Sequence, residues 1–383
     1  MEKLTYGMIG GGRGAFIGAV HRIAAELDHG ATLAAGALSS DPLRAKASGE
    51  DLGLDPARTH GSWRELLESE RARDPGDRID FVSIVTPNDS HFEIAEAFAA
   101  AGFHVVLDKP MTVTIEQAER LTRVVRDSGV VFAVTYNYTG YPLVRQARQM
   151  IQRGELGAIR RVIAEYHQGW LATPLEQTGQ KQASWRTDPK RAGVGGSVGD
   201  IGSHAENLIS FVTGLEMRSL CAQVSTFVEG RAIDDDAAVL IRFDGGAVGT
   251  LSCSQVCVGE ENGLTLRVYG EKGGLSWKQE NPNELIHAPI DAPRRILTRG
   301  GPGLGERATS ATRIPAGHPE GYLEGFANLY REVIAEIRAR KEATSSPCTE
   351  WLVPTVEDGA RGVRFIHAVI ESGNAGGRWV DLG

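Results

Sequence analysis

The size and charge of the chain narrow the classes of protein to which it can belong. With 383 residues it is too long for one ordinary hydrophobic core, so two domains are expected. Its 41% hydrophobic and 23% charged residues are typical of a soluble globular protein. Its net charge of −8 argues against a nucleic-acid-binding surface, which would need a basic excess.

The start of the chain predicts neither export nor membrane insertion. Residues 1–6 show no basic stretch leading into a long apolar core, and no run of about 18 apolar residues occurs. We therefore expect a cytoplasmic protein without a membrane segment. The cysteines are too few and too scattered for a disulfide framework or a metal site, so we predict no metal and four buried, reduced thiols: Cys221, Cys253, Cys257 and Cys348.

A glycine-rich turn follows the first apolar segment. Residues 5–9 predict a strand, Gly10-Gly11-Gly12-Arg13-Gly14-Ala15 a turn, and the next residues a helix that Gly30 ends. The apolar stripe of that helix is Phe16, Val20, Ile23 and Leu27. A plain glycine turn is the alternative, but this order favours a dinucleotide site framed by Gly10, Gly12 and Ala15. Glycines let the backbone approach a pyrophosphate at the positive end of a helix.

The end of the second strand, residues 32–38, bears on the choice of cofactor. An NAD enzyme usually has an acid near this point to hold the ribose 2′-hydroxyl. Here Ser39 takes that place, and Asp41 instead predicts a helix N-cap with Pro42 at the first helical position. A serine suits either cofactor, and Arg44 could reach a 2′-phosphate. NAD and NADP therefore both stay open, with NAD preferred.

Strands and helices alternate as far as residue 137. Capping boxes at Ser62 and Ser90 predict helix starts, and residues 114–127 predict a further helix. Further strands are predicted at 79–85, 104–107 and 130–136. This alternation predicts a parallel, doubly wound sheet, whose ligands gather at the carboxyl ends of its strands. The residues at those ends are Gly10, Ser39, Thr86, Asp108, Lys109 and Asn137.

Beyond residue 137 strands become frequent. Helices are expected only at 142–153, 200–211 and 320–340, and residues 288–318, rich in Pro, Gly and Arg, predict a long loop. The predicted fold is α/β, with an N-terminal Rossmann domain at 1–137. A C-terminal α+β domain with a large, mostly antiparallel sheet is expected at 138–383.

The stretch Val105-Val106-Leu107-Asp108-Lys109-Pro110 ends a strand in an acid, a lysine and a proline. A lysine at a strand end is usually just solvated. This lysine follows the strand beside which the nicotinamide half of a dinucleotide should lie, which favours a function. A cationic nicotinamide ring and partial burial both favour the neutral amine, the form that accepts a proton.

A second constellation is Gly199-Asp200-Ile201-Gly202-Ser203-His204. Asp200 and His204 are four residues apart and would share one helix face. One interpretation is a capped helix start with a partly buried histidine. The preceding run 193–197 contains three glycines, which allows another backbone or a ligand to come close and favours function. In the functional interpretation Asp200 orients a substrate hydroxyl and His204 exchanges its proton.

These motifs together resemble one enzyme family. The glycine turn, Thr86-Pro87-Asn88-x-x-His91, Asp108-Lys109-Pro110 and Asp200-x-Gly-x-His204 occur in order at fitting distances. Over essentially its whole length the chain resembles the Gfo/Idh/MocA oxidoreductases, the group of glucose–fructose oxidoreductase and the inositol dehydrogenases. The resemblance implies reversible, NAD(P)-dependent oxidation of a secondary alcohol of a sugar or cyclitol. It also implies a homo-oligomer, dimer or tetramer, formed through the open face of the second sheet.

Residue by residue, the resemblance makes Lys109 the proton-transfer group and Asp200 and His204 the substrate-side acid and histidine. Asp108 stands where the family more often has Glu, so a shorter reach is expected. The residues expected at the cofactor are Gly10, Gly12, Arg13, Gly14, Ala15, Ser39, Ser40, Arg44, Thr86, Pro87, Asn88, His91, Asp108, Asn137, Trp185 and Arg186. Those expected at the substrate are Lys109, Tyr138, His167, Trp185, Asp200, His204 and His318.

Two acid- or aromatic-rich segments leave alternatives. Residues 170–191 resemble an extended substrate loop, in which Trp185 either stacks on the apolar face of a sugar or only anchors the loop. Asp234-Asp235-Asp236 predicts a solvated acidic turn rather than a metal site, because consecutive residues do not easily converge on one ion.

Three other functions stay open from the sequence. The family includes glycosidases that keep NAD bound and oxidise their substrate transiently, and regulators that bind the dinucleotide without catalysis. A scaffold with a vestigial site is the third. The presence of Lys109, Asp200 and His204 together favours the dehydrogenase, because a regulator has no need of a proton-transfer set.

Overall fold

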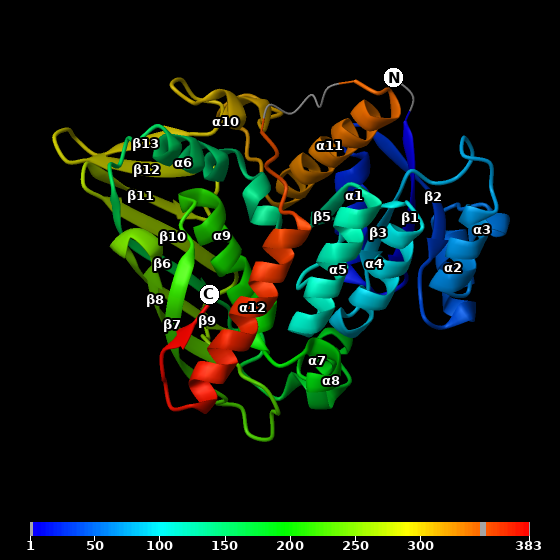
Figure 1. Cartoon of the computed structure of the whole chain (residues 1–383), viewed down its shortest axis with the longest axis horizontal. Coiled ribbons are helices and arrows are strands. Elements are labelled where there is room, and N and C mark those ends of the chain that lie inside the picture. The colour runs from blue at the N-terminus through cyan, green and yellow to red at the C-terminus, as the bar shows by residue number, and fades with distance from the viewer. Residues whose placement is uncertain (1–2, 345–349, 383) are drawn as a thin grey trace. The chain divides into compact units, whose positions relative to one another are not determined.

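The computed structural model describes residues 3–344 and 350–382 of the chain (Figure 1). It contains two compact units. The Rossmann unit comprises residues 1–137 and 322–360, and the sheet unit comprises 138–321 and 361–383.

The Rossmann unit is built on a five-stranded sheet of order β2-β1-β3-β4-β5. Its neighbouring strands are all parallel, which confirms the doubly wound sheet. The chain runs from β1 outward to β2 and then to β3 on the other side of β1. This reversal opens a crevice at the carboxyl ends of β1 and β3, where dinucleotides bind in such folds. The strands are β1 Leu4–Gly10, β2 Ala31–Ala37, β3 Phe81–Val85, β4 His104–Leu107 and β5 Phe132–Val134.

Polar side chains start most of the helices of this unit. Asp41 accepts hydrogen bonds from the N–H groups of Leu43 and Arg44, which confirms its predicted cap. Ser90 does not cap a helix; its hydroxyl donates to the Pro87 carbonyl, and the capping box predicted there was wrong. A short 3₁₀ turn over Asn88–Ser90 displaces the start of α4. The helices are α1 Phe16–Glu26, α2 Pro42–Asp51, α3 Trp63–Arg71, α4 His91–Ala100 and α5 Ile115–Ser128.

Of the apolar stripe predicted for α1, only Val20 is buried, and small residues make up most of the buried face. Phe16 and Ile23 are 67% and 47% exposed, whereas Gly18, Ala24 and Ala25 are buried. The reason is the close approach of the helix to the glycine turn. A Cβ atom on Gly18 would lie 2.3 Å from the Cα atom of Gly11, so no larger side chain fits between them. The side chains of Phe16 and Ile23 are therefore left exposed.

A late helix completes the core of the Rossmann unit. Helix α11, Tyr322–Lys341, packs on α1. The Tyr330 hydroxyl lies 2.7 Å from His21 Nδ1 and 2.9 Å from Ser83 Oγ, so α1, β3 and α11 share one buried polar cluster. Residues far apart in sequence thus hold the segment that carries the glycine turn.

The sheet unit contains nine strands in the order β13-β12-β11-β10-β6-β9-β8-β7-β14. All neighbouring pairs are antiparallel except β6 with β9, which confirms the mostly antiparallel sheet. Helices α6 and α9 lie against one face (Figure 1), and side chains alternate between buried and exposed along the strands. The opposite face is therefore open. The strands are β6 Ile159–His167, β7 Met217–Ser225, β8 Asp236–Phe243, β9 Val248–Ser254, β10 Gly263–Gly270, β11 Gly273–Lys278, β12 Glu284–Pro289, β13 Arg295–Thr298 and β14 Val380–Asp381.

Several helices of the sheet unit were not predicted. The segment expected to be a loop, 288–318, contains β13 and the short helix α10, so that expectation was wrong in part. Helix α12 begins in the Rossmann unit and continues into the sheet unit. The helices are α6 Pro142–Gln152, α7 Lys181–Arg186, α8 Pro189–Ala192, α9 Ser203–Thr213, α10 Glu306–Ser310 and α12 Val356–Asn374.

The expected burial of the thiols holds for one cysteine of the three that can be placed. Cys253 is buried, whereas Cys221 and Cys257 are half-buried, and Cys348 lies outside the described residues. Within residues 3–344 and 350–382, every helix is too short or too polar to cross a membrane.

The Rossmann unit is expected to lose stability in mild acid because it buries two histidines. Burial lowers the pKa of His21 and of His104 from 6.5 to about 4. The His104 Nδ1 atom also accepts a hydrogen bond from the Val131 N–H, which only an unprotonated nitrogen can do. Between pH 6.5 and about 4 the unfolded chain therefore binds more protons than the folded chain, so the free energy of unfolding falls as the pH falls. The expected loss is about 1 kcal/mol per histidine on going from about pH 7.5 to about pH 5.5.

Urea denaturation at the two pH values tests this expectation. His104→Asn keeps an acceptor for the Val131 N–H but cannot titrate, so its stability should fall less with pH than that of the wild type. His29→Asn is the matched control, because His29 is exposed and its φ of 55° suits asparagine. Equal pH dependence in the wild type and His104→Asn would contradict the role of His104.

Candidate functional site

The glycine turn of the Rossmann unit presents backbone N–H groups at the start of α1. Gly10, Gly11 and Gly14 have φ between 73° and 79°, a region that glycine adopts without strain. Helix α1 has Ala15 at its N-cap, no side-chain cap and no acid in its first turn. Its first N–H groups are therefore not capped by a side chain, and no nearby acid repels an anion. This cradle fits the pyrophosphate of a dinucleotide.

The turn also contacts the end of β2, where the ribose position is expected. The Gly12 N–H donates to the Leu38 carbonyl at 3.1 Å, and a Cβ on Gly12 would lie 2.6 Å from that oxygen. Ser39 Oγ accepts a hydrogen bond from the Asp41 N–H at 3.1 Å, while Ser40 and Arg44 are exposed. The predicted residues of the glycine turn and of the β2 end thus lie at one edge of the sheet.

Arg13 forms an ion pair that the sequence did not reveal. Its guanidinium contacts both carboxylate oxygens of Asp51, with Nη2 2.6 Å from Oδ1. This hydrogen bonding lowers the pKa of the Asp51 carboxyl. Asp51 is the last residue of α2, where the helix dipole disfavours an acid. An acid at the C-terminal end of a predicted helix is a signal from which a cationic partner for Asp51 could have been inferred.

His91 joins two loops of the predicted cofactor edge. It is fully buried, and its ring nitrogens lie 2.8 Å from the Thr86 carbonyl oxygen and 2.9 Å from the Pro110 carbonyl oxygen. Ser90 Oγ lies 2.8 Å from Thr86 Oγ1, and Asn88 is also buried. His91 therefore ties together the loops after β3 and β4, and both of its ring nitrogens contact backbone carbonyls.

Lys109 follows β4 on a backbone that Asp108 fixes. Asp108 Oδ1 accepts hydrogen bonds from the Lys109 N–H at 2.9 Å and from Thr135 Oγ1 at 3.1 Å. The side chain of Lys109 is half-buried, and the peptide bond between Lys109 and Pro110 is cis. Asn137, at the end of the next segment, is buried, and its Nδ2 atom has no hydrogen-bond partner among the residues that the structure describes.

In the sheet unit, Asp200 lies in a π turn, Val198–Gly202, that leads into α9. Neither the turn nor α9 has a side-chain cap, so the interpretation of Asp200 as a capping residue was wrong. Its Oδ2 atom accepts a hydrogen bond from Gln255 Nε2 at 2.8 Å and lies 3.3 Å from Arg186 Nε. A π turn of this kind often marks a functional site.

His204 lies beside two tyrosines. Its ring is 4.9 Å from the ring of Tyr138 and 6.2 Å from that of Tyr166. The two tyrosine hydroxyls are 2.6 Å apart, and that of Tyr166 donates to Asn262 Oδ1 at 2.7 Å. Burial raises the pKa of Tyr138, and the Asp200 carboxylate acts in the same direction. Tyr138 is therefore a protonated neighbour of both Asp200 and His204.

The predicted substrate loop adds two residues to this cluster. The Arg186 guanidinium lies 4.2 Å from the centre of the Trp185 ring while its Nε contacts Asp200. Trp185 Nε1 donates to Gln182 Oε1 at 3.3 Å. The structure thus brings together Tyr138, Trp185, Arg186, Asp200 and His204, which we call the Asp200 cluster.

Two predicted substrate residues lie elsewhere. His167 follows Tyr166 on β6 and points to the other face of the sheet, where its Nε2 lies 2.9 Å from Ser252 Oγ. His318 is exposed in the loop before α11, and Arg299 binds its backbone carbonyl. Neither is among the residues gathered around Asp200.

Sequence reasoning missed Tyr166, Gln255 and Asn262. The inward-facing Tyr166 of β6 was a usable signal, because a buried tyrosine hydroxyl needs a partner. Gln255 and Asn262 gave none, since the pairing of distant strands brings them to the cluster.

Comparison with known proteins agrees with this geometry. Residues 4–136 match the model of an oxidoreductase family with an NAD-binding Rossmann fold, and residues 144–276 match the GFO/IDH/MocA C-terminal domain. The uncharacterized oxidoreductase YfiI of Bacillus subtilis is 33% identical over 100% of this chain and 97% of its own length. The chain belongs to the Gfo/Idh/MocA oxidoreductase family.

Two similar proteins carry names that refer to a dehydrogenase. An inositol dehydrogenase homolog from Azotobacter vinelandii, solved with NAD⁺, is 38% identical over 99% of this chain and 97% of its own, with a TM-score of 0.95. The same protein was solved with NADH and myo-inositol, at 37% identity over 99% and 98% and a TM-score of 0.93. The levoglucosan dehydrogenase of Pseudarthrobacter phenanthrenivorans is 30% identical over 74% of this chain and 76% of its own.

Two of the three aspartates in the acidic run of this Gfo/Idh/MocA protein are buried, and the third, Asp236, begins β8, so the predicted solvated turn was wrong. Asp234 and Asp235 are 5% and 1% exposed. Asp235 accepts hydrogen bonds from the N–H groups of Phe227 and Val228 and from Arg231 Nη1. Burial raises the pKa of Asp234, while its hydrogen bonds act in the opposite direction. Buried carboxylates need such donors.

The contact between Gly11 and Gly18 predicts a strong effect of one added carbon on cofactor binding. Gly18→Ala should weaken NADH binding about tenfold or more, because overpacking costs ~1–3 kcal/mol and ~1.4 kcal/mol is tenfold. The new Cβ would meet backbone atoms of Gly11 that cannot rotate away. Gly76→Ala is the matched control, since nothing lies within 4 Å of a Cβ at Gly76. An unchanged dissociation constant for NADH, measured by fluorescence titration of Gly18→Ala, would contradict this expectation.

Proposed function

We propose that the protein is an NAD-dependent dehydrogenase that reversibly oxidises a secondary hydroxyl of a cyclitol or sugar to the ketone or lactone. The observation that carries this proposal is the Asp200 cluster, in which a carboxylate, a histidine, a tyrosine and a tryptophan converge. Hydrogen-bonding groups interleaved with aromatic rings suit a polyhydroxylated ring, which has polar edges and apolar faces. The myo-inositol of the Azotobacter homolog and the name of the levoglucosan dehydrogenase support the same substrate class.

The residues of the two units take different roles in this proposal. In the Rossmann unit the glycine turn, Ser39 and the loops after β3 and β4 bind the dinucleotide, and the half-buried Lys109 accepts the proton of the reacting hydroxyl. In the sheet unit Asp200 accepts a hydrogen bond from a substrate hydroxyl and His204 shares the proton transfer. Trp185 packs on the apolar face of the substrate ring. Bound NAD supplies the acceptor for the hydride.

We infer a preference for NAD over NADP from the pairing of Arg13 with Asp51. A 2′-phosphate needs a cation near the end of β2, and the glycine turn that carries Arg13 contacts that end. Asp51 occupies the guanidinium with two hydrogen bonds and adds a negative charge that would repel a phosphate. A neutral 2′-hydroxyl meets neither obstacle.

We also propose that the open face of the nine-stranded sheet binds a second copy of the chain. Leu240 and Ile296 are each 51% exposed on this face, and Val248 and Tyr269 are 42% and 43% exposed. Apolar residues spread over a broad open sheet are typical of an interaction surface. This surface supports the homo-oligomer that the family resemblance implies.

Lys109→Ala tests the proposed proton transfer. Loss of a general base is expected to lower kcat about 10²–10⁴-fold, while the dissociation constant of NADH stays near that of the wild type. The assay is NADH formation with a panel of inositols, aldoses and glycosides, with Lys272→Ala as the control at an exposed lysine. Turnover of Lys109→Ala close to wild type would refute the assignment. Release of one NADH per product excludes a glycosidase that retains its cofactor.

Asp51→Asn tests the basis of cofactor preference. Released from Asp51, Arg13 can bind a 2′-phosphate through charge-assisted hydrogen bonds. The dissociation constant for NADP⁺, measured by calorimetry, should therefore fall about tenfold or more, with little change for NAD⁺. Glu50→Gln is the matched control, because it removes a neighbouring acid that does not hydrogen-bond Arg13. The gain should vanish when Arg13→Gln is added, and its persistence in the double variant would contradict the role of Arg13.

A further inference from the structure

One connection in the sheet unit holds both ends of the segment 173–198, which contains most of the predicted substrate loop 170–191 and the glycine-rich run that follows it. This segment, called the loop below, contains a 3₁₀ turn at Leu175–Thr178 and the helices α7 and α8. It carries Trp185 and Arg186 to the Asp200 cluster. Its two ends are hydrogen-bonded to residues 226–235, the connection between β7 and β8.

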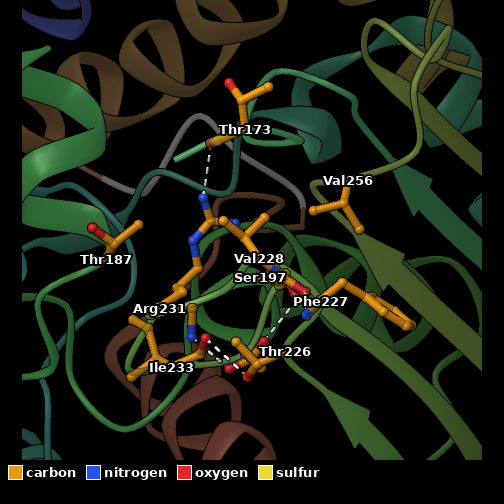
Figure 2. A network of polar contacts seen from close by, with 12 residues as sticks. Thr173, Thr187, Ser197, Thr226, Phe227, Val228, Arg231, Ile233 and Val256 are labelled. Atoms are coloured by element: carbon orange, nitrogen blue, oxygen red, sulfur yellow. Dashed lines mark hydrogen bonds and ion pairs between the residues drawn. The ribbon is translucent and has the colours of Figure 1, made fainter. Parts of the chain in front are cut away.

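Arg231 holds the first end of the loop. Its Nη2 atom donates to the Thr173 carbonyl at 3.1 Å, and Nε and Nη2 contact the Glu176 carboxylate at 3.1 and 3.0 Å. Figure 2 shows the Arg231 side chain reaching toward Thr173. The remaining nitrogen, Nη1, pairs with Asp235 at 3.1 Å. The Arg231 side chain is only 1% exposed, so its charge depends on these partners.

Asp234 holds the second end of the loop. Its Oδ1 atom accepts from the Gly196 N–H at 2.6 Å, and Oδ2 accepts from Ser197 Oγ and the Val198 N–H at 2.7 and 2.9 Å. A Cβ on Gly196 would lie 2.1 Å from the Asp234 carbonyl oxygen, so this contact requires glycine. The close approach expected of this glycine-rich run is made by the backbone of Asp234.

The same connection also places Asp200. The Asp200 N–H donates to the Gly196 carbonyl at 2.9 Å, so the backbone that Asp234 fixes leads directly into the π turn. The Gln255 N–H donates to the Asp235 carbonyl at 2.8 Å, and the Gln255 side chain donates to Asp200 Oδ2 at 2.8 Å. Backbone and carboxylate of Asp200 are thus both set from residues 234 and 235.

We propose that Arg231 and Asp234 are positioning residues, which clamp residues 173–198 at both ends and hold Trp185 and Arg186 against Asp200. The clamp sets the affinity for the substrate and leaves cofactor binding alone. This inference rests on the proposed function of Asp200 as the substrate-side acid. The charges of the clamp are buried, so it cannot open by exchanging its partners for water at low cost.

Three variants and a control test the clamp in the full-length protein. Arg231→Met removes the first anchor, Arg231→Lys keeps its charge, and Asp234→Asn removes the acceptor of Ser197 and Val198. Arg299→Met is the control, because the Arg299–Glu320 pair is equally buried in the same unit and its contacts lie outside the loop. It shows what the loss of a buried ion pair does by itself.

Hydrogen exchange gives the readout that needs no substrate. Amides of 173–186 should exchange faster in Arg231→Met and those of 193–203 faster in Asp234→Asn, with Arg231→Lys between Arg231→Met and the wild type. Arg299→Met should lower the melting temperature and leave exchange in 173–198 unchanged. Unchanged exchange in both Arg231→Met and Asp234→Asn, or the same change in Arg299→Met, would overturn the clamp.

Kinetics separate positioning from general stability. Misplacement of a substrate-binding group by ~1 Å costs about 100-fold, so kcat/KM should fall about that much in Arg231→Met and Asp234→Asn. Most of the loss should lie in KM, with the dissociation constant of NADH unchanged. Faster exchange with an unchanged KM would overturn the positioning role. If the wild-type enzyme oxidises no cyclitol or sugar, the proposed function is refuted instead. The hydrogen-exchange measurements then still decide whether the clamp exists.

Discussion

The carboxylates of Asp234 and Asp235 lie out of water, and the donors that surround them organise the substrate side of the sheet unit. A buried carboxylate without hydrogen bonds is costly, so each oxygen must be met by an N–H, a hydroxyl or a guanidinium. The donors come from the loop 173–198 and from the connection 226–235 itself. The hydrogen bonds to the Asp234 and Asp235 carboxylates therefore fix both the loop 173–198 and the connection 226–235. Asp200 lies on the backbone that continues directly from this loop.

The Rossmann unit is under a different constraint, because its glycine turn requires side chains to be absent. The glycine turn works because Gly11 and Gly18 bring a strand and a helix into backbone contact and leave the first N–H groups of α1 uncapped. Large apolar residues such as Phe16 are driven to the surface by the same contact. The sheet unit thus positions its polar groups through buried charges. The Rossmann unit positions its backbone N–H groups through the absence of side chains at the glycine turn.

The sequence allowed the strands and the motif residues to be predicted, because apolar runs that end in glycine or polar residues report local structure directly. It failed where a distant contact decides. The acidic sequence around Asp234 is typical of a solvated turn. Only the hydrogen bonds of Asp234 with residues 196–198 show that it is buried and that it fixes this segment. Helix α12 contains glycines that weaken its helical signal, yet a Cβ on Gly359 would lie 2.6 Å from Met111 Sδ, and one on Gly373 would lie 2.6 Å from Val224 Cγ2. These glycines allow close packing, which no single-sequence pattern records.

Arg186 of the loop and Arg231 of the clamp differ in the free-energy cost of breaking their ion pairs with aspartate. Arg186 and Asp200 are 23% and 18% exposed, and an ion pair that water can reach contributes only ~0–1 kcal/mol. The proposed function requires Asp200 to exchange Arg186 for a substrate hydroxyl, and the access of water keeps the cost of that exchange low. Arg231 and Asp235 are each 1% exposed, and breaking one buried pair costs ~3–5 kcal/mol. Burial thus separates a pair that can exchange partners at low cost from a pair that stays closed, although both consist of one arginine and one aspartate.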